Sequence, residues 1–85
     1  MGIKKDFLGG HKVYHSTERI ISSKKVDGDI VIKTAQHDKF VLKSDKAKKQ
    51  PEPGSFITIY YICSSQVVGV DINGSNLYFL DEKDI

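Results

Sequence analysis

Residues 65–80 of the chain read SQVVGVDINGSNLYFL, in which two runs of alternating apolar residues flank Asn73 and Gly74. This pattern predicts a β-hairpin with a two-residue type I′ turn, because Asn and Gly tolerate the positive φ angles that both central positions of that turn require. The facing pairs expected from such a turn are Ile72 with Ser75, Asp71 with Asn76, Val70 with Leu77, Gly69 with Tyr78, Val68 with Phe79, and Val67 with Leu80.

The two faces of this predicted hairpin differ in character. One face is nearly all apolar, and because side chains alternate along a strand, we expect that face to lie in the core. The other face is mixed, with Gly69 leaving room beneath Tyr78. The hairpin is therefore expected to close the core with one face and to present Tyr78 on the other.

Further segments upstream also alternate with the period of a β-strand. Asp27 and Gly28 predict a second hairpin, whose first strand covers residues 19–26. Its expected facing pairs are Val26 with Asp29 and Lys24 with Val31. The segment FVLKS, residues 40–44, predicts another strand, and SFITIYYIC, residues 55–63, is apolar on both faces, which is typical of a central strand. The predicted core residues are Ile30, Ile32, Phe40, Leu42, Ile57, Ile59, Val68, Val70, Leu77 and Phe79.

Two segments fit this alternation poorly. Residues 45–54, DKAKKQPEPG, predict a loop, because proline cannot donate a hydrogen bond to a sheet, with room for one helical turn at 44–49. Lysines gather in and beside this loop: Lys43, Lys46, Lys48 and Lys49. Near the N-terminus, HKVYH, residues 11–15, predicts only a weak edge strand.

The regular spacing of strands and turns predicts an all-β fold. We expect a small antiparallel barrel or a two-sheet sandwich of five to seven short strands, with little or no helix. Such a domain has the size of SH3-like, Sm-like and OB-like barrels. The 85 residues fit a single domain over residues 1–85, in which residues 1–10 and 81–85 are expected to be flexible ends.

The composition is that of a folded, water-soluble domain, with 39% hydrophobic and 28% charged residues. No apolar run approaches the roughly 18 residues that a membrane span needs, and no apolar segment follows the first lysines as in a secretory signal. Cys63 is the only cysteine, so no internal disulfide can form. A reducing compartment, and hence a cytoplasmic location, is expected.

The sequence contains no catalytic signature, so we expect a protein that is not an enzyme and that needs no cofactor. Cys63 ends an apolar run and is expected to be a buried thiol, where the reactive thiolate is disfavoured. His11 and His15 are four residues apart, but an extended segment with too few further ligands does not make a metal site. We therefore expect no metal.

A non-catalytic binding module is the function that remains. A small domain of this kind acts most simply by docking on one larger protein through a sheet edge or an outward face, as accessory or inhibitor proteins of phages and other mobile elements do. An edge strand also offers a contact for a homodimer. The candidate partner-binding residues are Tyr78, Tyr14, Tyr60, Lys43, Lys46, Lys48, Lys49, Arg19, Lys24 and Lys25.

The alternative partner is single-stranded nucleic acid. Small β-barrels bind single strands by combining a basic groove with aromatic rings on which bases stack, and the lysine-rich loop and the tyrosines supply both residue types. The net charge of +2 is weak for this function.

Overall fold

A computed structural model describes residues 6–46, 49–63, 66–81 and 83 of the chain. The strands are β1 (Phe7–Leu8), β2 (His11–Lys12), β3 (Tyr14–Val26), β4 (Asp29–Thr34), β5 (Phe40–Leu42), β6 (Phe56–Ile62), β7 (Gln66–Ile72) and β8 (Ser75–Phe79). No α-helix occurs in these described residues, and so none that is long and apolar enough to cross a membrane. The predicted all-β class is confirmed.

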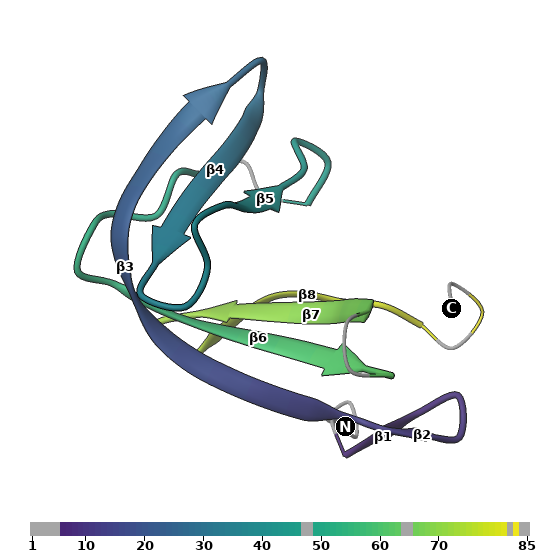
Figure 1. Cartoon of the computed structure of the whole chain (residues 1–85). Helices are drawn as coiled ribbons and strands as arrows, with labels where there is room; N and C mark the ends of the chain where they lie inside the picture. Colours follow the sequence, from purple (N-terminus) through teal and green to yellow (C-terminus); the bar gives the residue numbers. More distant parts are fainter. Residues whose placement is uncertain (1–5, 47–48, 64–65, 82, 84–85) are drawn as a thin grey trace.

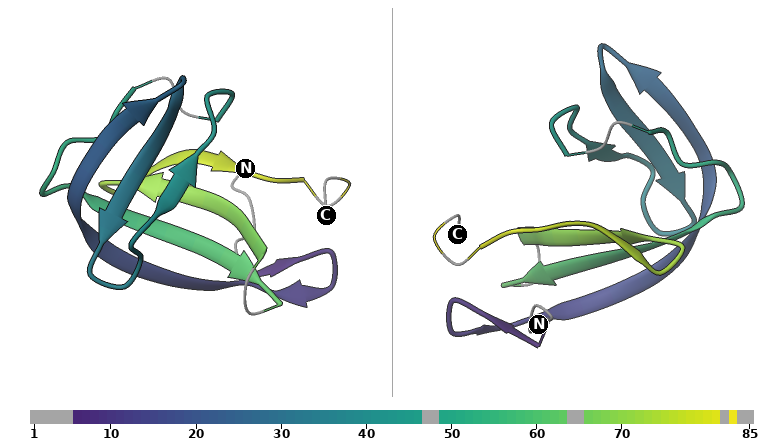
Figure 2. Two further views of the ribbon diagram at one scale, coloured as in Figure 1. Left: turned by 45° about the horizontal axis from the view of Figure 1, so that its top comes forward. Right: turned by 180° about the vertical axis from the view of Figure 1, so that it is seen from behind.

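Six of the strands form one antiparallel sheet in the order β5-β4-β3-β6-β7-β8, which curls into a half-barrel (Figure 1). Strands β1 and β2 form a separate two-stranded sheet. The 13-residue β3 pairs with β6 over its first half and with β4 over its second half. Seen from behind, β3 is the curved strand that joins an arm of β4 and β5 to an arm of β6, β7 and β8 (Figure 2).

A β-bulge marks the place where β3 changes partner. The last pair with β6 is Arg19 with Phe56, and the pairing with β4 then shifts register between Ile20 and Ser22. Bulges increase the local bend and twist of a strand, which is what a sheet needs in order to curl. Ile20 is buried at this bend, whereas Ile21 is 54% exposed.

The prediction of a weak edge strand at residues 11–15 holds for its first two residues and is wrong for its last two. His11 and Lys12 belong to β2, and from Tyr14 onward the chain enters β3, which lies in the interior of the six-stranded sheet. The first half of β3 is polar in sequence although β6 pairs with it, so alternation of apolar residues gave no signal there.

Both predicted tight turns are confirmed. Asp27 and Gly28 have φ angles of 52° and 88°, and Asn73 and Gly74 have φ angles of 51° and 83°. The expected pairs around the first turn, Val26 with Asp29 and Lys24 with Val31, are present. The turn residues therefore set the register next to each turn, as the sequence indicates.

The predicted register of the last hairpin holds only near its turn. Ile72 pairs with Ser75 and Asp71 with Asn76, but the register then shifts by one residue. The observed pairs are Val70 with Tyr78 and Gly69 with Phe79, and the amide of Leu80 donates to the carbonyl of Val68 at 2.8 Å. The predicted pairs of Val70 with Leu77, Gly69 with Tyr78, Val68 with Phe79 and Val67 with Leu80 are wrong.

Packing of Phe79 against Gly69 accounts for this shift. A Cβ atom on Gly69 would lie 2.5 Å from Cδ2 of Phe79, so the ring occupies the space that the glycine leaves. Between the pairs Asp71–Asn76 and Val70–Tyr78, β8 has one residue more than β7, namely Leu77. This extra residue turns Tyr78 toward the inside of the half-barrel, where Tyr78 packs against the main core cluster. Tyr78 is therefore half-buried, and its expected place on an outer face is wrong.

The core consists of two clusters on opposite faces of β6, β7 and β8. The main cluster inside the half-barrel comprises Ile20, Ile30, Ile32, Leu42, Ile57, Ile59 and Val70. The second cluster lies against the small sheet and comprises Leu8, Val13, Ile62 and Val68. Because β6 contributes to both clusters, its predicted central place is confirmed.

The predicted core residues all lie in or against these clusters. Phe40, Leu77 and Phe79 are only partly buried. Sequence analysis missed Leu8, Val13, Ile20 and Ile62. Leu8 and Val13 pack from the small sheet and from the residue before β3, where the segments were too short to show a period.

Candidate functional site

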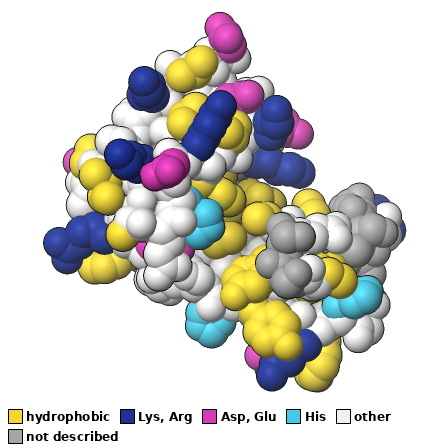
Figure 3. Space-filling view, in the orientation of Figure 1, with side chains coloured by type: hydrophobic (Ala, Val, Ile, Leu, Met, Phe, Trp, Pro, Cys, Tyr) yellow, Lys and Arg dark blue, Asp and Glu magenta, His cyan; other side chains and the backbone are white. Residues whose placement is uncertain are grey.

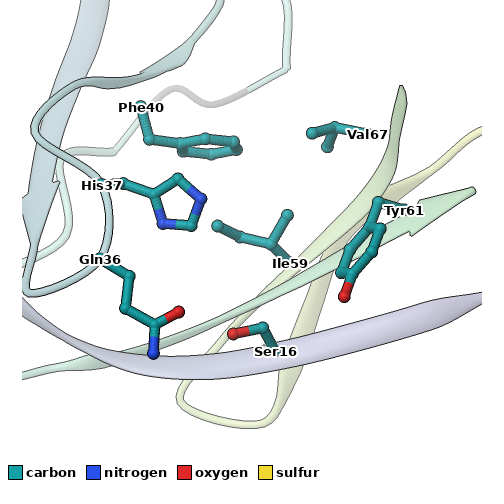
Figure 4. Close-up of a pocket in the computed structure, with 7 residues that line it drawn as sticks. All are labelled: Ser16, Gln36, His37, Phe40, Ile59, Tyr61 and Val67. Carbon is teal, nitrogen blue, oxygen red and sulfur yellow. The ribbon is translucent and has the colours of Figure 1, made fainter. Parts of the chain in front are cut away.

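A pocket of about 380 Å³ lies between the two arms of the half-barrel. In Figure 3, hydrophobic side chains gather in the hollow between the arms, with a histidine beside them. The pocket is lined by Ser16, Gln36, His37, Phe40, Ile59, Tyr61 and Val67 (Figure 4).

The apolar walls of the pocket come from both arms. Phe40 begins β5 and packs partly against the main core cluster. Opposite it, Tyr61 pairs with Val67 because a register shift between β6 and β7 inserts an extra residue after Val67. The Tyr61 ring is held from behind by the ring of Tyr14, whose centroid is 5.9 Å away.

A buried carboxylate lies at the polar side of the pocket. Alternation along β3 places Glu18 on the same face as buried Ile20, and the Glu18 side chain is only 5% exposed. The hydroxyl of Thr34 donates to Oε1, and the hydroxyl of Ser16 donates to Oε2 at 3.2 Å. Nδ1 of His37 lies 3.2 Å from Oε1 and 3.1 Å from Oε2.

These donors keep Glu18 ionised. Burial by itself raises the pKa of Glu18, but hydrogen bonds from Thr34, His37 and Ser16, together with the positive charge that the His37 ring carries when it is protonated, lower it by more. The net result is a pKa below the ordinary value of 4.5. Glu18 is therefore a carboxylate, and an acceptor only, at neutral pH.

Thr34 fixes the loop that carries His37. The backbone amide of Thr34 donates to the carbonyl of His37 at 2.9 Å, and the amide of His37 donates to the Thr34 hydroxyl at 3.0 Å. The His37 ring also packs edge-on against Phe40, with centroids 6.2 Å apart. The imidazole is thereby held in place although its side chain is 41% exposed.

The contacts of His37 determine which ring nitrogen carries the proton. Nδ1 faces two oxygens of an ionised carboxylate, so it must carry a hydrogen. In the neutral ring, Nε2 is then a hydrogen-bond acceptor. Figure 4 shows this second nitrogen pointing into the pocket, toward the side of Tyr61 and Val67. With the His37 ring neutral, the site thus offers an oriented imidazole acceptor among apolar walls.

None of the predicted lysines in the described part of the chain lines this pocket. Nζ of Lys43 lies 3.7 Å from the Asp29 carboxylate, and Nζ of Lys46 lies 5.4 Å from the ring centre of Tyr78. Lys49 borders a different hollow, beside residues 50–52, and Lys48 lies outside the described residues.

The other predicted basic residues lie apart from this loop. Lys24 and Lys25 are exposed near the end of β3, and the guanidinium of Arg19 lies 5.1 Å from the ring centre of Phe56. The structure therefore does not bring the basic candidates together into one groove.

The predicted tyrosines have different surroundings. Tyr14 is 47% exposed and stacks on Tyr61. Tyr60 donates to the Asp71 carboxylate at 2.7 Å, and its ring packs against Phe79. Burial, together with the charge of Asp45, raises the pKa of Tyr78 above its ordinary 10.0. Of these candidates, only Tyr14 touches a residue of the pocket and has a largely accessible ring.

The expectation that Cys63 is a buried thiol is wrong. Cys63 follows β6 at a φ angle of 52°, and it is exposed. Its Sγ atom lies 3.5 Å from Nδ1 of His11. Within the described residues, no three metal-ligating side chains come together.

Sequence analysis predicted Phe40 and Ile59 only as core residues and missed the polar residues at and behind the pocket, Glu18 and His37. The signal for Glu18 was present, because Glu18 has the same alternation phase as Ile20 and an acidic residue at an inward position needs partners. No such signal marks His37 in the sequence, because a histidine in a loop is not part of an alternating pattern of apolar and polar residues. Its place depends on the hydrogen bonds to Thr34 and Glu18, which are distant in sequence from one another.

No family model, curated protein or solved structure matches the chain. Inference about function therefore starts from the geometry of this pocket.

Proposed function

We propose that the protein is a non-catalytic protein-interaction module that holds an apolar side chain of one protein partner in the pocket between the two arms. The observation that carries this proposal is the pocket itself, with walls of Phe40, Ile59 and Val67 and a single oriented imidazole. Buried anchor side chains that fill such pockets dominate the energy of protein interfaces.

Charge favours a protein partner over nucleic acid. No lysine or arginine lines the pocket among the described residues, and Lys43 and Lys46 already contact Asp29 and Tyr78. A binder of single strands needs basic side chains along a groove with accessible rings. Binding of nucleic acid is therefore the alternative outcome of the experiment described next.

Peptide display tests the proposal. A random peptide library is selected on the immobilised protein, and the enriched peptides are titrated into isotope-labelled protein while amide shifts are recorded. We expect shifts at the residues that line the pocket, and Val67→Lys should weaken peptide binding at least about tenfold, because it places a charge in the apolar wall.

A matched variant controls for general effects of an added lysine. Val41 lies on the outer face of β5, is 37% exposed and does not line the pocket, so Val41→Lys should bind the peptides like the wild type. Equal loss in both variants, or shifts away from the pocket, would contradict the proposal. Specific binding of a single-stranded oligonucleotide at physiological salt that is lost in a Lys46→Ala, Lys49→Ala variant would support the alternative instead.

A further inference from the structure

When its ring is neutral, His37 has one acceptor nitrogen whose hydrogen bond is not used within the described part of the chain. Every hydrogen bond that the described residues make with the His37 ring goes to Nδ1, from the side of Glu18 and Thr34. Nε2 points the other way, into the pocket (Figure 4). An occupant that covers this nitrogen without donating to it leaves a buried acceptor unpaired, which costs binding energy.

The charge around His37 selects a neutral donor. The ionised Glu18 lies directly behind the ring, so an anionic occupant is repelled, and when the His37 ring is neutral no positive charge among the lining residues offsets that repulsion. A cationic occupant finds no free carboxylate, because Thr34, Ser16 and His37 all bind the oxygens of Glu18. A neutral N–H or O–H group is the donor that fits.

The remaining walls suit a flat apolar body. The rings of Phe40 and Tyr61 belong to opposite arms, with Ile59 at the base between them and Val67 beside Tyr61 (Figure 4). Aromatic rings pack favourably against other rings in edge-on or offset arrangements. A ring inserted between these walls therefore gains contacts that a branched aliphatic side chain does not.

We infer that the partner's anchor is an aromatic side chain with a hydrogen-bond donor on its ring, the indole of a tryptophan or the phenol of a tyrosine, donating to Nε2 of the neutral His37 ring. This inference rests on the proposed function and specifies the occupant of the same pocket. Indole and phenol share the required chemistry, and the test includes both.

Four small probes test the inference without a known partner: the N-acetyl amides of tryptophan, tyrosine, phenylalanine and leucine. Each is titrated into isotope-labelled protein at about pH 8, above the ordinary imidazole pKa of about 6.5. Backbone amides and the His37 ring nitrogens are followed by NMR, and the ring-nitrogen shifts verify that the imidazole is neutral. We expect dissociation constants of about 1 mM or weaker for such small ligands. The tryptophan or tyrosine amide should bind about five- to tenfold more tightly than the phenylalanine amide, because only these two can pair Nε2.

The variants separate the hydrogen bond from simple packing. The double variant Glu18→Gln, His37→Phe keeps a ring at the pocket and leaves no unpaired carboxylate behind it, so it should bind the phenylalanine and tyrosine amides equally. His15→Phe is the matched control, because the His15 ring packs against Tyr60 and does not line the pocket. It should keep the preference of the wild type, and thermal melting should show that both variants fold.

The outcomes distinguish this inference from the proposed function. If all four amides shift the pocket residues with equal affinity, the inference is wrong while the proposed pocket stands. If the donor preference survives in the double variant, the assignment to His37 is wrong. If no probe shifts the pocket residues, both the inference and the proposed function fall.

Discussion

The buried carboxylate of Glu18 makes the stability of this fold depend on pH. Glu18 is almost fully buried and is held by Thr34, Ser16 and His37, and its pKa in the folded protein is below the ordinary value. The folded state therefore binds a proton at Glu18 less readily than the unfolded chain does. The stability that Glu18 contributes is fully present above its ordinary pKa of 4.5 and is lost as the pH falls through the lower folded value.

We predict that Glu18→Gln removes this acid-dependent part of the stability. At about pH 7 the variant should be less stable by about 1–3 kcal/mol, because an amide replaces a carboxylate that three donors bind. At about pH 3 the difference should shrink, since the wild-type carboxylate then begins to bind a proton. Urea denaturation at both pH values measures the two differences. A gap that is the same at both would contradict an ionised Glu18 in the fold.

At the scale of the element, the register of the last hairpin depends on the packing of the Phe79 ring against Gly69. The Asn-Gly turn sets the first two pairs, and the packing of Phe79 over Gly69 accompanies the shift that follows. The polar side chains support this arrangement, because Asp71 accepts from Tyr60 at 2.7 Å and from Asn76 at 2.8 Å. The packing of Phe79 on Gly69 and the hydrogen bonds to Asp71 thus stabilise a register that differs from the one that simple alternation predicts.

We predict that Gly69→Ala destabilises the protein by about 1–3 kcal/mol, because the new methyl group would collide with the Phe79 ring. Phe79→Ala also destabilises, since it removes a ring from the second core cluster. The double variant should lose less stability than the sum of the two, because without the ring the methyl group no longer collides. Thermal or urea melts of the four proteins measure this coupling, and strict additivity would argue against the contact.

A second prediction at this scale concerns the turn itself. Gly74 has a φ angle of 83°, which a β-branched residue adopts only with strain. Gly74→Val should therefore destabilise by about 1–3 kcal/mol, more than an ordinary surface change. Ser75→Val is a neighbouring control in the strand, where valine is favoured. Similar melting temperatures for both variants would show that the turn is not strained.

At the scale of the whole molecule, β3 organises the fold because it pairs with both arms. Its first half binds β6 and its second half binds β4, whereas β5 and β8 are the outer strands of the sheet. Amides in central, doubly paired strands open less often than amides at edges. The stability of the fold should therefore decrease from β3 and β6 outward.

Hydrogen exchange measures this gradient. We predict the slowest exchange in the paired amides of β3 and β6, over residues 14–19 and 56–61, and faster exchange in β5 and β8. Slowest exchange in β5 would mean that the two arms are stabilised independently of β3.

The sequence predicts the local parts of this fold better than the long-range ones. Turns such as Asp27-Gly28 and apolar strands such as Phe56–Ile62 carry their own signals, because turn geometry and two-sided burial depend on neighbouring residues. The first half of β3 and the site are different, since Glu18 and His37 acquire their roles from contacts across 19 residues of sequence. Pairing between distant polar residues leaves no period that sequence inspection can detect.

The shared strand β3 also determines where the chain can be divided. A cut between β5 and β6 gives one fragment with β1 to β5 and another with β6 to β8, and the ladder between β3 and β6 is the sheet pairing that joins them. Each fragment alone lacks a large part of the main core cluster, to which β3, β4 and β5 contribute from one side and β6 and β7 from the other. The two fragments are therefore expected to be largely unfolded apart and to complement each other when mixed, recovering a β-sheet circular dichroism spectrum that neither gives alone. The long curved strand would then act as the template on which the second fragment folds.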